Sequence, residues 1–386
     1  MQTNPSPVVE QEAEFSRRLQ TARLQTVNIL FAFDGSEHSV AAIEMLERCF
    51  TQAQPPGGAF SSEAESAASA VSAASTGALS AEITALCVLP TQYFESHQIM
   101  QAALDKASAR LSRQGFPVKT LLKSGNPAPA IIDYAEEIDA DLILVGAQGL
   151  RATLGILLGG VAQQIVEYAQ RPVMVVRAGG AGRPTLRQVL VVVDGSPASQ
   201  KAVEYLAPHC PGDPGAVVLT ADGLPLRPAG DMPAHPFDSH AHNPHQPRHT
   251  TTCSWLPPNS EITLMHVLPP PLTIDAASRA WTLGPEVLYP APLSPIDRET
   301  IEAQERQAGD SILQAGRQRL EAAGYRVRSV LERGDAATQI LQHTRDHPVD
   351  LVVCGSRGLN PVSGWLLGSV SRKLVHYCGC SVLIVK

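Results

Sequence analysis

The sequence lacks several features that would place it in a common class. No apolar run approaches the roughly 20 residues that a transmembrane helix needs, and no basic segment followed by an apolar core marks a secretory signal near Met1. Neither sign of charge dominates, since 37 acidic and 30 basic residues leave a net charge of −7, with no basic surplus for nucleic acid or an acidic membrane. We therefore expect a cytoplasmic protein that binds neither nucleic acid nor membrane.

Disulfide patterns and familiar catalytic motifs are also missing. The seven cysteines are scattered through apparent strands and helices, which is typical of reduced thiols rather than a disulfide framework. Cys378 and Cys380 form the one close pair, for which small buried thiols are the expectation and a redox pair the alternative. The sequence contains no G-x4-G-K-[ST] loop and no evident nucleophile beside a base, so we assign no catalytic residue.

An internal repeat organises the chain of 386 residues. Asp141–Arg177 aligns with Asp350–Lys386 without a gap at an offset of 209, and ten of the first 22 aligned positions are identical. Upstream, Phe31–Ser36 (FAFDGS) parallels Val191–Ser196 (VVVDGS) at an offset of 160, so the second copy holds 49 extra residues. Length and repeat together predict two domains of about 150 residues each, plus extra segments.

The repeat also sets the expected segment boundaries. In order, these are an N-terminal tail at 1–24, a first domain at 25–177, a linker at 178–186 and a second domain at 187–386. An Ala/Ser-rich loop at 59–81 and a Pro/His-rich insertion at 211–260 fall outside the repeated core. The insertion lacks the ordered spacing of a four-ligand metal site, so we assign no metal to its clustered side chains, His235, His240, His242, His245, His249 and Cys253.

Each copy alternates short apolar strands with helical segments. Strands that are apolar along nearly their whole length indicate a parallel sheet covered by helices on both faces. The sequence therefore predicts an α/β fold of two flavodoxin-like, three-layer domains, each with a five-stranded parallel sheet. The expected strands are 27–33, 82–89, 118–123, 141–146 and 173–177 in the first copy, and 188–193, 261–268, 326–332, 350–355 and 381–385 in the second.

A glycine-rich loop follows the fourth strand of the second copy, where open α/β sheets bind their ligands. It reads Gly355-Ser-Arg-Gly358, then nine residues, then Gly368-Ser369-Val-Ser371. Glycines allow the backbone to approach a ligand oxygen, and the helix that follows offers unpaired N–H groups and the positive end of its dipole. Hydroxyl groups of Ser369 and Ser371 can donate to phosphate oxygens. The alternative is a tight turn and a helix cap without a ligand.

With this loop, the sequence resembles the universal stress protein family, whose ATP-binding members carry the pattern G-x2-G-x9-G-[ST]. The DGS after the first strand of each copy belongs to the same resemblance. It implies an adenine nucleotide alpha hydrolase-like form of the fold, a stress-response role, and ATP as ligand, alone or with Mg²⁺. It also implies that Asp194 approaches the ribose or a phosphate-bound metal and that backbone near Val267 meets the adenine. The phosphates would then be held by Gly355, Gly358, Gly368, Ser369 and Ser371.

The first copy carries a reduced version of this site. It keeps the acidic residue and the loop glycines but lacks both hydroxyl groups, since Gly160 and Ala162 stand where the second copy has serine. Losing two phosphate hydrogen bonds costs about 1–3 kcal/mol, or roughly one to two decades of affinity. We therefore expect nucleotide mainly on the second domain, with a weaker first-domain site at Asp34, Gly146, Gly149, Gly159 and Gly160.

Partners and rival functions follow from the same resemblance. Dimers of the family commonly pair through the last strand, so 173–176 and 382–385 are expected to meet edge to edge as an intrachain pseudo-dimer, which hides two exposed edges. A homodimer of two chains is also left open. So are a slow ATPase or adenylyl-transferring enzyme on the same loop, a nucleotide-free dimerisation scaffold and an FMN site. Candidate phosphate contacts from side chains are Arg357, Arg372 and Lys373.

Overall fold

The computed structural model describes residues 26–49, 80–91, 96–149, 158–178, 186–207, 256–257, 260–270, 295–359 and 367–386. The predicted tail lies outside these residues. So do the 59–81 loop, the 178–186 linker and the 211–260 insertion, apart from a few residues at their ends. Ser80 and Ala81, expected at the end of the loop, instead begin a strand.

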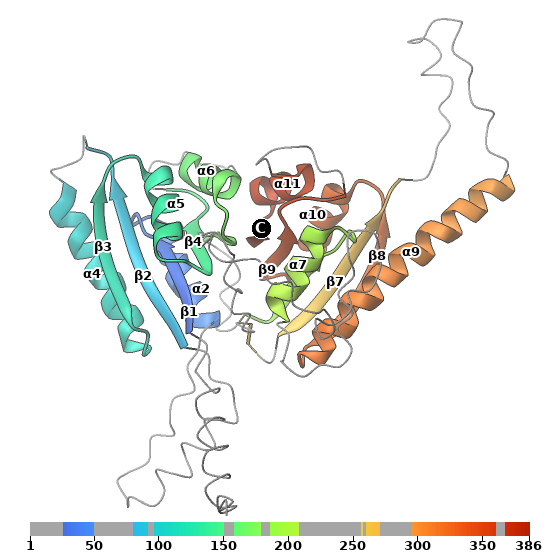
Figure 1. The fold of residues 1–386 in the computed structure, drawn as a ribbon, viewed down its shortest axis with the longest axis horizontal. Coiled ribbons are helices and arrows are strands. Elements are labelled where there is room, and N and C mark those ends of the chain that lie inside the picture. The colour runs from blue at the N-terminus through green and yellow to red at the C-terminus, as the bar shows by residue number, and fades with distance from the viewer. Residues whose placement is uncertain are drawn as a thin grey trace, which may run out of the picture.

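A single ten-stranded sheet runs through both copies of the repeat (Figure 1). The strand order is β3-β2-β1-β4-β5-β10-β9-β6-β7-β8. The first half of the sheet comprises β1 (Thr26–Ala32), β2 (Ser80–Leu89), β3 (Val118–Ser124), β4 (Leu142–Gly146) and β5 (Val173–Val176). The second half comprises β6 (Gln188–Val192), β7 (Glu261–Leu268), β8 (Arg326–Arg333), β9 (Leu351–Gly355) and β10 (Ser381–Val385). All neighbouring strands within each half are parallel.

Helices cover both faces of the sheet and bury its apolar strands. One face packs against α2 (Glu37–Cys49), α4 (His97–Arg113), α7 (Pro197–Leu206) and α9 (Pro295–Ala322). The other packs against α5 (Pro127–Glu137), α6 (Gly160–Tyr168), α10 (Ala336–Asp346) and α11 (Ser369–Tyr377). Alternate residues of each strand enter the two cores, as with Phe31 in one and Leu30 in the other, because successive side chains point to opposite faces.

The predicted three-layer α/β architecture with five parallel strands per half is confirmed. Each half has the order 3-2-1-4-5, which is the order of the first five strands of a dinucleotide-binding sheet. The direction of winding therefore reverses between β1 and β4, and again between β6 and β9. Ligands of such sheets bind beyond the carboxyl ends of the two strands at this reversal.

The two halves join through their last strands, as the sequence predicted. β5 and β10 pair antiparallel, with Val382 opposite Val175, Leu383 opposite Met174 and Ile384 opposite Val173. All of these residues are buried. The pairing removes two apolar edges from solvent and makes one continuous sheet from the two halves.

At the seam, one basic side chain from each half binds backbone carbonyl groups of the other half. Arg177, which follows β5, donates through Nη2 to the carbonyl oxygens of Val375 and His376 in α11, at 2.6 and 3.1 Å. Lys386, its equivalent in the repeat, donates through Nζ to the carbonyl oxygen of Val166 in α6. Carbonyl groups at the end of a helix lack intrahelical partners and favour a positive charge. Each half therefore caps the short helix of the other, and α6 and α11 lie side by side in Figure 1.

Lys386 at the seam is expected to make the free energy of unfolding increase at alkaline pH, and Lys386→Met should abolish this increase. Burial, and then the charge of Arg357, lower the pKa of Lys386 to about 8, below the value of 10.5 usual for lysine. Between these two values the unfolded chain holds a proton that the folded protein has released, so the free energy of unfolding rises with pH. We expect a rise of about 2 kcal/mol, which is less than the full shift because the hydrogen bond to Val166 favours the charged amine. Urea unfolding of both proteins between pH 7 and pH 10.5 measures it, and parallel curves would contradict the assignment.

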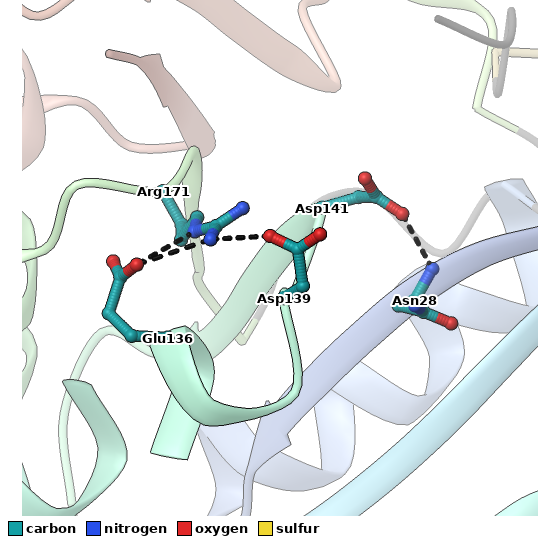
Figure 2. A network of polar contacts seen from close by, with 5 residues as sticks. All are labelled: Asn28, Glu136, Asp139, Asp141 and Arg171. Carbon is teal, nitrogen blue, oxygen red and sulfur yellow. Dashed lines mark hydrogen bonds and ion pairs between the residues drawn. The ribbon is translucent and has the colours of Figure 1, made fainter. Parts of the chain in front are cut away.

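Paired aspartates fix the opposite end of the sheet, where the strands begin. Asp141 accepts a hydrogen bond from the backbone N–H of Asn28 at 2.8 Å, which ties the start of β4 to the start of β1 (Figure 2). Beside it, Arg171 contacts Glu136 and Asp139 at 3.2 and 2.6 Å and holds the turn between α5 and β4. In the second half, Asp350 accepts from the backbone N–H groups of residues 187 and 188. These clamps set the alignment of the strands whose other ends carry the loop.

Among the described residues, no helix combines the length and the apolar character needed to cross a membrane.

Candidate functional site

The acidic residue and the glycine-rich loop of the second half meet where the winding of the sheet reverses. Asp194 follows the end of β6, and Gly355 is the last residue of β9, the strand next to β6. The loop leaves β9 and leads to α11, with residues 360–366 outside the described part of the chain. The sequence placed these residues at one site through the resemblance to the family.

Asp194 and Gly358 touch. A Cβ atom at Gly358 would lie 2.7 Å from Oδ2 of Asp194, so the carboxylate occupies the space that any other side chain would need. The other carboxylate oxygen, Oδ1, accepts a hydrogen bond from the backbone N–H of Ser196 at 3.0 Å. Ser196 caps α7 by accepting from the N–H of Ser199, and its hydroxyl reaches the carbonyl oxygen of Arg357 at 3.4 Å. The first strand, the helix after it and the loop thus form one connected unit.

Gly355 packs against backbone atoms, whereas Gly358 packs against a side chain. A Cβ atom there would lie 2.5 and 2.6 Å from the carbonyl carbon and oxygen of Ala198 and 2.8 Å from the nitrogen of Ser199. These are backbone atoms in the first turn of α7, which cannot move aside as a flexible side chain would. The absence of a side chain lets the end of β9 lie directly against α7.

The helix after the loop begins with its N–H groups near the same place. Gly368 is the N-cap of α11, its N–H donates to the carbonyl oxygen of Ser356 at 2.8 Å, and Ser356 in turn donates to Val385 at 2.7 Å. Ser369, the first residue of α11, is exposed. Its hydroxyl and the start of the helix are accessible from solvent, as an anion site requires.

Ser371 has another function in this structure. It is buried, and its hydroxyl donates to the carbonyl oxygen of Gly355 at 2.7 Å. We expected this hydroxyl to serve a phosphate, but in the observed conformation its proton closes the loop internally. The first half has Ala162 here, also buried, so its loop lacks this internal bond.

Val267 lies on β7 beyond the end of its pairing with β6. The β6–β7 ladder ends at Val192 and Met265, whereas the β7–β8 ladder continues to Leu268 and Arg333. The Val267 backbone therefore has no strand partner on the β6 side among the described residues. Its neighbour His266 is buried and its Nδ1 lies 2.8 Å from the carbonyl oxygen of Val193, which satisfies the imidazole as expected of a core histidine.

A cavity of about 330 Å³ adjoins the loop and reaches across the seam. Its wall includes Ser356 and Gly358 of the loop, Lys201 of α7, Arg357 and Lys386, and also Glu167 and Gln170 from the first half. A larger hollow of about 690 Å³ lies along α9, but only residues of that helix line it and none belongs to the loop. We favour the smaller cavity because loop backbone and three basic side chains converge on it.

The sequence suggested three basic side chains as phosphate contacts, Arg357, Arg372 and Lys373, and two of them form ion pairs with carboxylates. Arg372 lies 3.8 Å from Glu167, across the seam, and Lys373 lies 3.6 Å from Asp335. Both side chains are about half exposed, so these are weak surface pairs that a phosphate group can displace. Arg357 lines the cavity directly.

The first half builds nearly the same backbone. A Cβ atom at Gly149 would lie 2.7 Å from Oδ2 of Asp34, the same distance as in the second half. Gly159 donates to the carbonyl oxygen of Ala147 at 2.8 Å, and Ala147 donates to Val176 at 2.7 Å, which again match their counterparts. Gly146 packs close to the Cβ of His38, the counterpart of Ala198. Gly160 begins α6 and supplies no hydroxyl. In the described residues at the two ends of the loops, the halves therefore share these backbone contacts and differ in side chains.

Among the described residues, no group of three or more His, Cys, Asp or Glu side chains is arranged to hold a metal ion. The histidines of the 211–260 insertion lie outside them. A metal that arrives with the nucleotide, bound to phosphate oxygens, needs only one or two carboxylate ligands from the protein.

Comparison with known proteins finds the same family by sequence model and by individual sequences, and a similar fold among solved structures. The model of the universal stress protein family matches residues 26–177 and 256–386. The chain is 32% identical over 88 residues to universal stress protein YxiE of Bacillus subtilis, which covers 23% of this chain and 60% of that protein. It is 38% identical over 77 residues to universal stress protein MJ0531 of Methanocaldococcus jannaschii, which covers 20% of this chain and 45% of that one. A crystal structure of a universal stress protein from Archaeoglobus fulgidus covers 93% of this chain and 98% of its own, with a TM-score of 0.49 and 17% identity.

Proposed function

Because this chain belongs to the universal stress protein family, we propose that it binds ATP through the loop of its second half and acts as a nucleotide-dependent regulator of a stress response. The observation that carries the proposal is the contact between Asp194 and Gly358 where the winding of the sheet reverses. A loop that only made a turn would need neither an aspartate packed on its glycine nor an exposed serine at the start of the next helix.

Each part of the site has a proposed contact. Asp194 approaches the ribose hydroxyls, or a Mg²⁺ ion on the phosphates, because a half-buried carboxylate with one oxygen already fixed is well placed to accept or coordinate. The backbone at Val267 meets the adenine through groups that no strand uses on the β6 side. The loop at Gly355 and Gly358, together with Gly368 and the exposed Ser369, surrounds the phosphates. The N–H groups of Ser356 and Gly368 already donate within the protein, and Ser371 supports the loop from within.

The first half contributes in two ways. Its own loop retains the backbone for a weaker site at Asp34, Gly146, Gly149, Gly159 and Gly160. The end of its helix α6 and the residues that follow also line the cavity beside the second loop. A phosphate group bound near Lys201, Arg357 and Lys386 would thus contact residues of both halves. This suits a regulatory module in which bound nucleotide changes the surface that a partner meets.

Titration calorimetry with Mg-ATP tests the proposal. We expect one strong site per chain, with a second site at least about ten times weaker, because the first half lacks both the Ser369 hydroxyl and the internal hydrogen bond of Ser371. Ser369→Ala should weaken the strong site about three- to tenfold through loss of one hydroxyl donor. Gly160→Ala, at the corresponding position of α6, is the matched control and should leave the strong site unchanged.

Other results would favour the rival functions. Two equal sites would contradict the ranking of the halves, and no heat of binding together with no co-purified nucleotide would indicate a scaffold. Single-turnover hydrolysis that is lost in Asp194→Ala would indicate an enzyme on the same loop.

A further inference from the structure

Two cysteine thiols touch where α11 ends and β10 begins. Cys378 is the C-cap residue of α11, and Cys380 directly precedes β10. Their Sγ atoms lie 3.2 Å apart, and both side chains are buried. A disulfide bond measures about 2.05 Å, so closing one here requires a movement of about 1.2 Å between the two sulfurs.

Charges and hydrogen bonds around the pair distinguish the two thiols. The hydrogen bond between the sulfurs lowers the pKa of Cys378, and Thr344 and the Arg177 guanidinium lower it further against the effect of burial. The same bond, with burial, raises the pKa of Cys380. The Cys378 sulfur also contacts the Thr344 hydroxyl at 4.0 Å, so we assign Cys378 as the nucleophilic sulfur and Cys380 as the neighbour that resolves an oxidised intermediate.

The buried side chain of Arg177 lies close in the fold to the end of α11, which carries Cys378. The Arg177 side chain is 92% buried, since its exposed fraction is 8%. Its Nε has no hydrogen-bond partner within the described part of the chain, although its Nη2 binds Val375 and His376 just before the pair. This buried guanidinium has a spare donor and binds carbonyl groups two and three residues before Cys378, where its positive charge favours a thiolate.

The other described cysteines lack this environment. Burial raises the pKa of Cys49 and of Cys354 to about 12 and that of Cys87 to about 11. None of the three has a second sulfur hydrogen-bonded to it. Oxidation of cysteine follows thiolate character, so these three should be inert where the pair reacts.

The turn between the two cysteines faces solvent. Gly379 is exposed, and a Cβ atom added to it would meet nothing within 4 Å. Cys378 is fully buried and Cys380 is 8% exposed, so a peroxide must enter as this turn opens.

We propose that Cys378 and Cys380 form a reversible redox site, in which a peroxide converts the two thiols into an intrachain disulfide. The Cys378 thiolate attacks one peroxide oxygen, an S–O bond forms as the O–O bond breaks, and the departing hydroxide takes a proton to become water. The Cys380 sulfur then attacks the sulfenic acid, the S–S bond forms and a second water leaves. The two thiols lose two electrons, which the peroxide accepts, and a dithiol reductant reverses the step by exchange.

The bond would tie the end of α11 to the start of β10. This is the strand that joins the two halves, and Ser381, its first residue, accepts a hydrogen bond from the backbone N–H of Arg177 at 3.3 Å. Oxidation therefore acts at the seam, whether or not nucleotide binds to the loop.

Peptide mapping of the full chain after peroxide treatment tests this site. Cys210 and Cys253 are first replaced with serine, which leaves the five cysteines that the structure describes. After treatment and alkylation, trypsin releases the peptide Leu374–Lys386 with both sulfurs. We expect this peptide to lose two hydrogens in mass, to resist alkylation, and to recover with dithiothreitol, at a rate at least about tenfold above that of any other cysteine.

Single substitutions separate the two roles. Cys380→Ser should accumulate a sulfenic acid on Cys378 that dimedone traps, and Cys378→Ser should leave Cys380 reduced at the same dose. Cys354→Ser, which removes a nearby buried thiol, should behave like its parent. The proposal is wrong if the peptide remains fully alkylated, if Cys378 is found joined to Cys354, or if Cys378→Ser is oxidised as fast as the parent.

Discussion

Alanine at position 358 is expected to weaken Mg-ATP binding by the second half about 100-fold, equivalent to about 3 kcal/mol. The new Cβ atom would lie 2.7 Å from Oδ2 of Asp194, so the carboxylate must turn away from the position in which it meets the ribose or the metal. The end of a side chain can move without unfolding the domain, so the loss should appear in affinity and little in stability. Calorimetric titration of folded protein measures it.

The repeat supplies a matched control for this variant. Gly149→Ala creates the same contact with Asp34 in the first half, also at 2.7 Å. It should leave the strong site intact and remove only the weak one. Equal losses in both variants, or none in Gly358→Ala, would overturn the assignment of the strong site.

Alanine at position 355 is expected to act on stability instead. Its Cβ atom would meet backbone atoms of Ala198 and Ser199 at 2.5–2.8 Å, and neither can give way without shifting α7 from the sheet. Overpacking of this kind costs about 3 kcal/mol. Urea unfolding followed by circular dichroism should show an earlier transition of the second half.

Gly379→Ala is the reference for this measurement, because a Cβ atom there meets nothing within 4 Å. It should change the free energy of unfolding by less than about 0.5 kcal/mol. If Gly355→Ala were as mild, the close packing of β9 on α7 would not be a determinant of the fold.

Much of the fold could be predicted because its signals are local. Apolar runs such as 351–355 and 381–385 are short enough to be strands and too apolar to have an exposed face, so they required helices on both sides. The edge-to-edge pairing of β5 with β10 was implied by the resemblance to the family, and it agrees with the need to hide two such edges. Strand order did not follow, because runs of similar apolar residues do not specify their neighbours.

The position of the loop was predicted better than the contacts of its side chains. Glycine spacing placed Gly355, Gly358 and Gly368 at the right end of β9, since only glycine tolerates such close contacts. Ser371 was expected to face a ligand, but its hydroxyl binds the carbonyl oxygen of Gly355. A serine hydroxyl can turn to either partner, and the sequence carries no signal that chooses between them.

Long-range polar contacts were missed altogether. Arg177 binds α11 nearly 200 residues away in sequence, and Asp350 binds the backbone of residues 187 and 188. Such partners become neighbours only after the strand alignment is known. The signal that could have found the first pair was positional: Arg177 and Lys386 end the two aligned stretches and are both basic.

The antiparallel junction of β5 and β10 has a consequence for behaviour on dilution. Two separate chains that paired through these strands would come apart at low concentration, whereas halves on one polypeptide face each other at a fixed effective concentration. The cavity beside the second loop, lined in part by the end of α6, is therefore complete in a single molecule. A cell can keep such a protein scarce and still have every copy assembled.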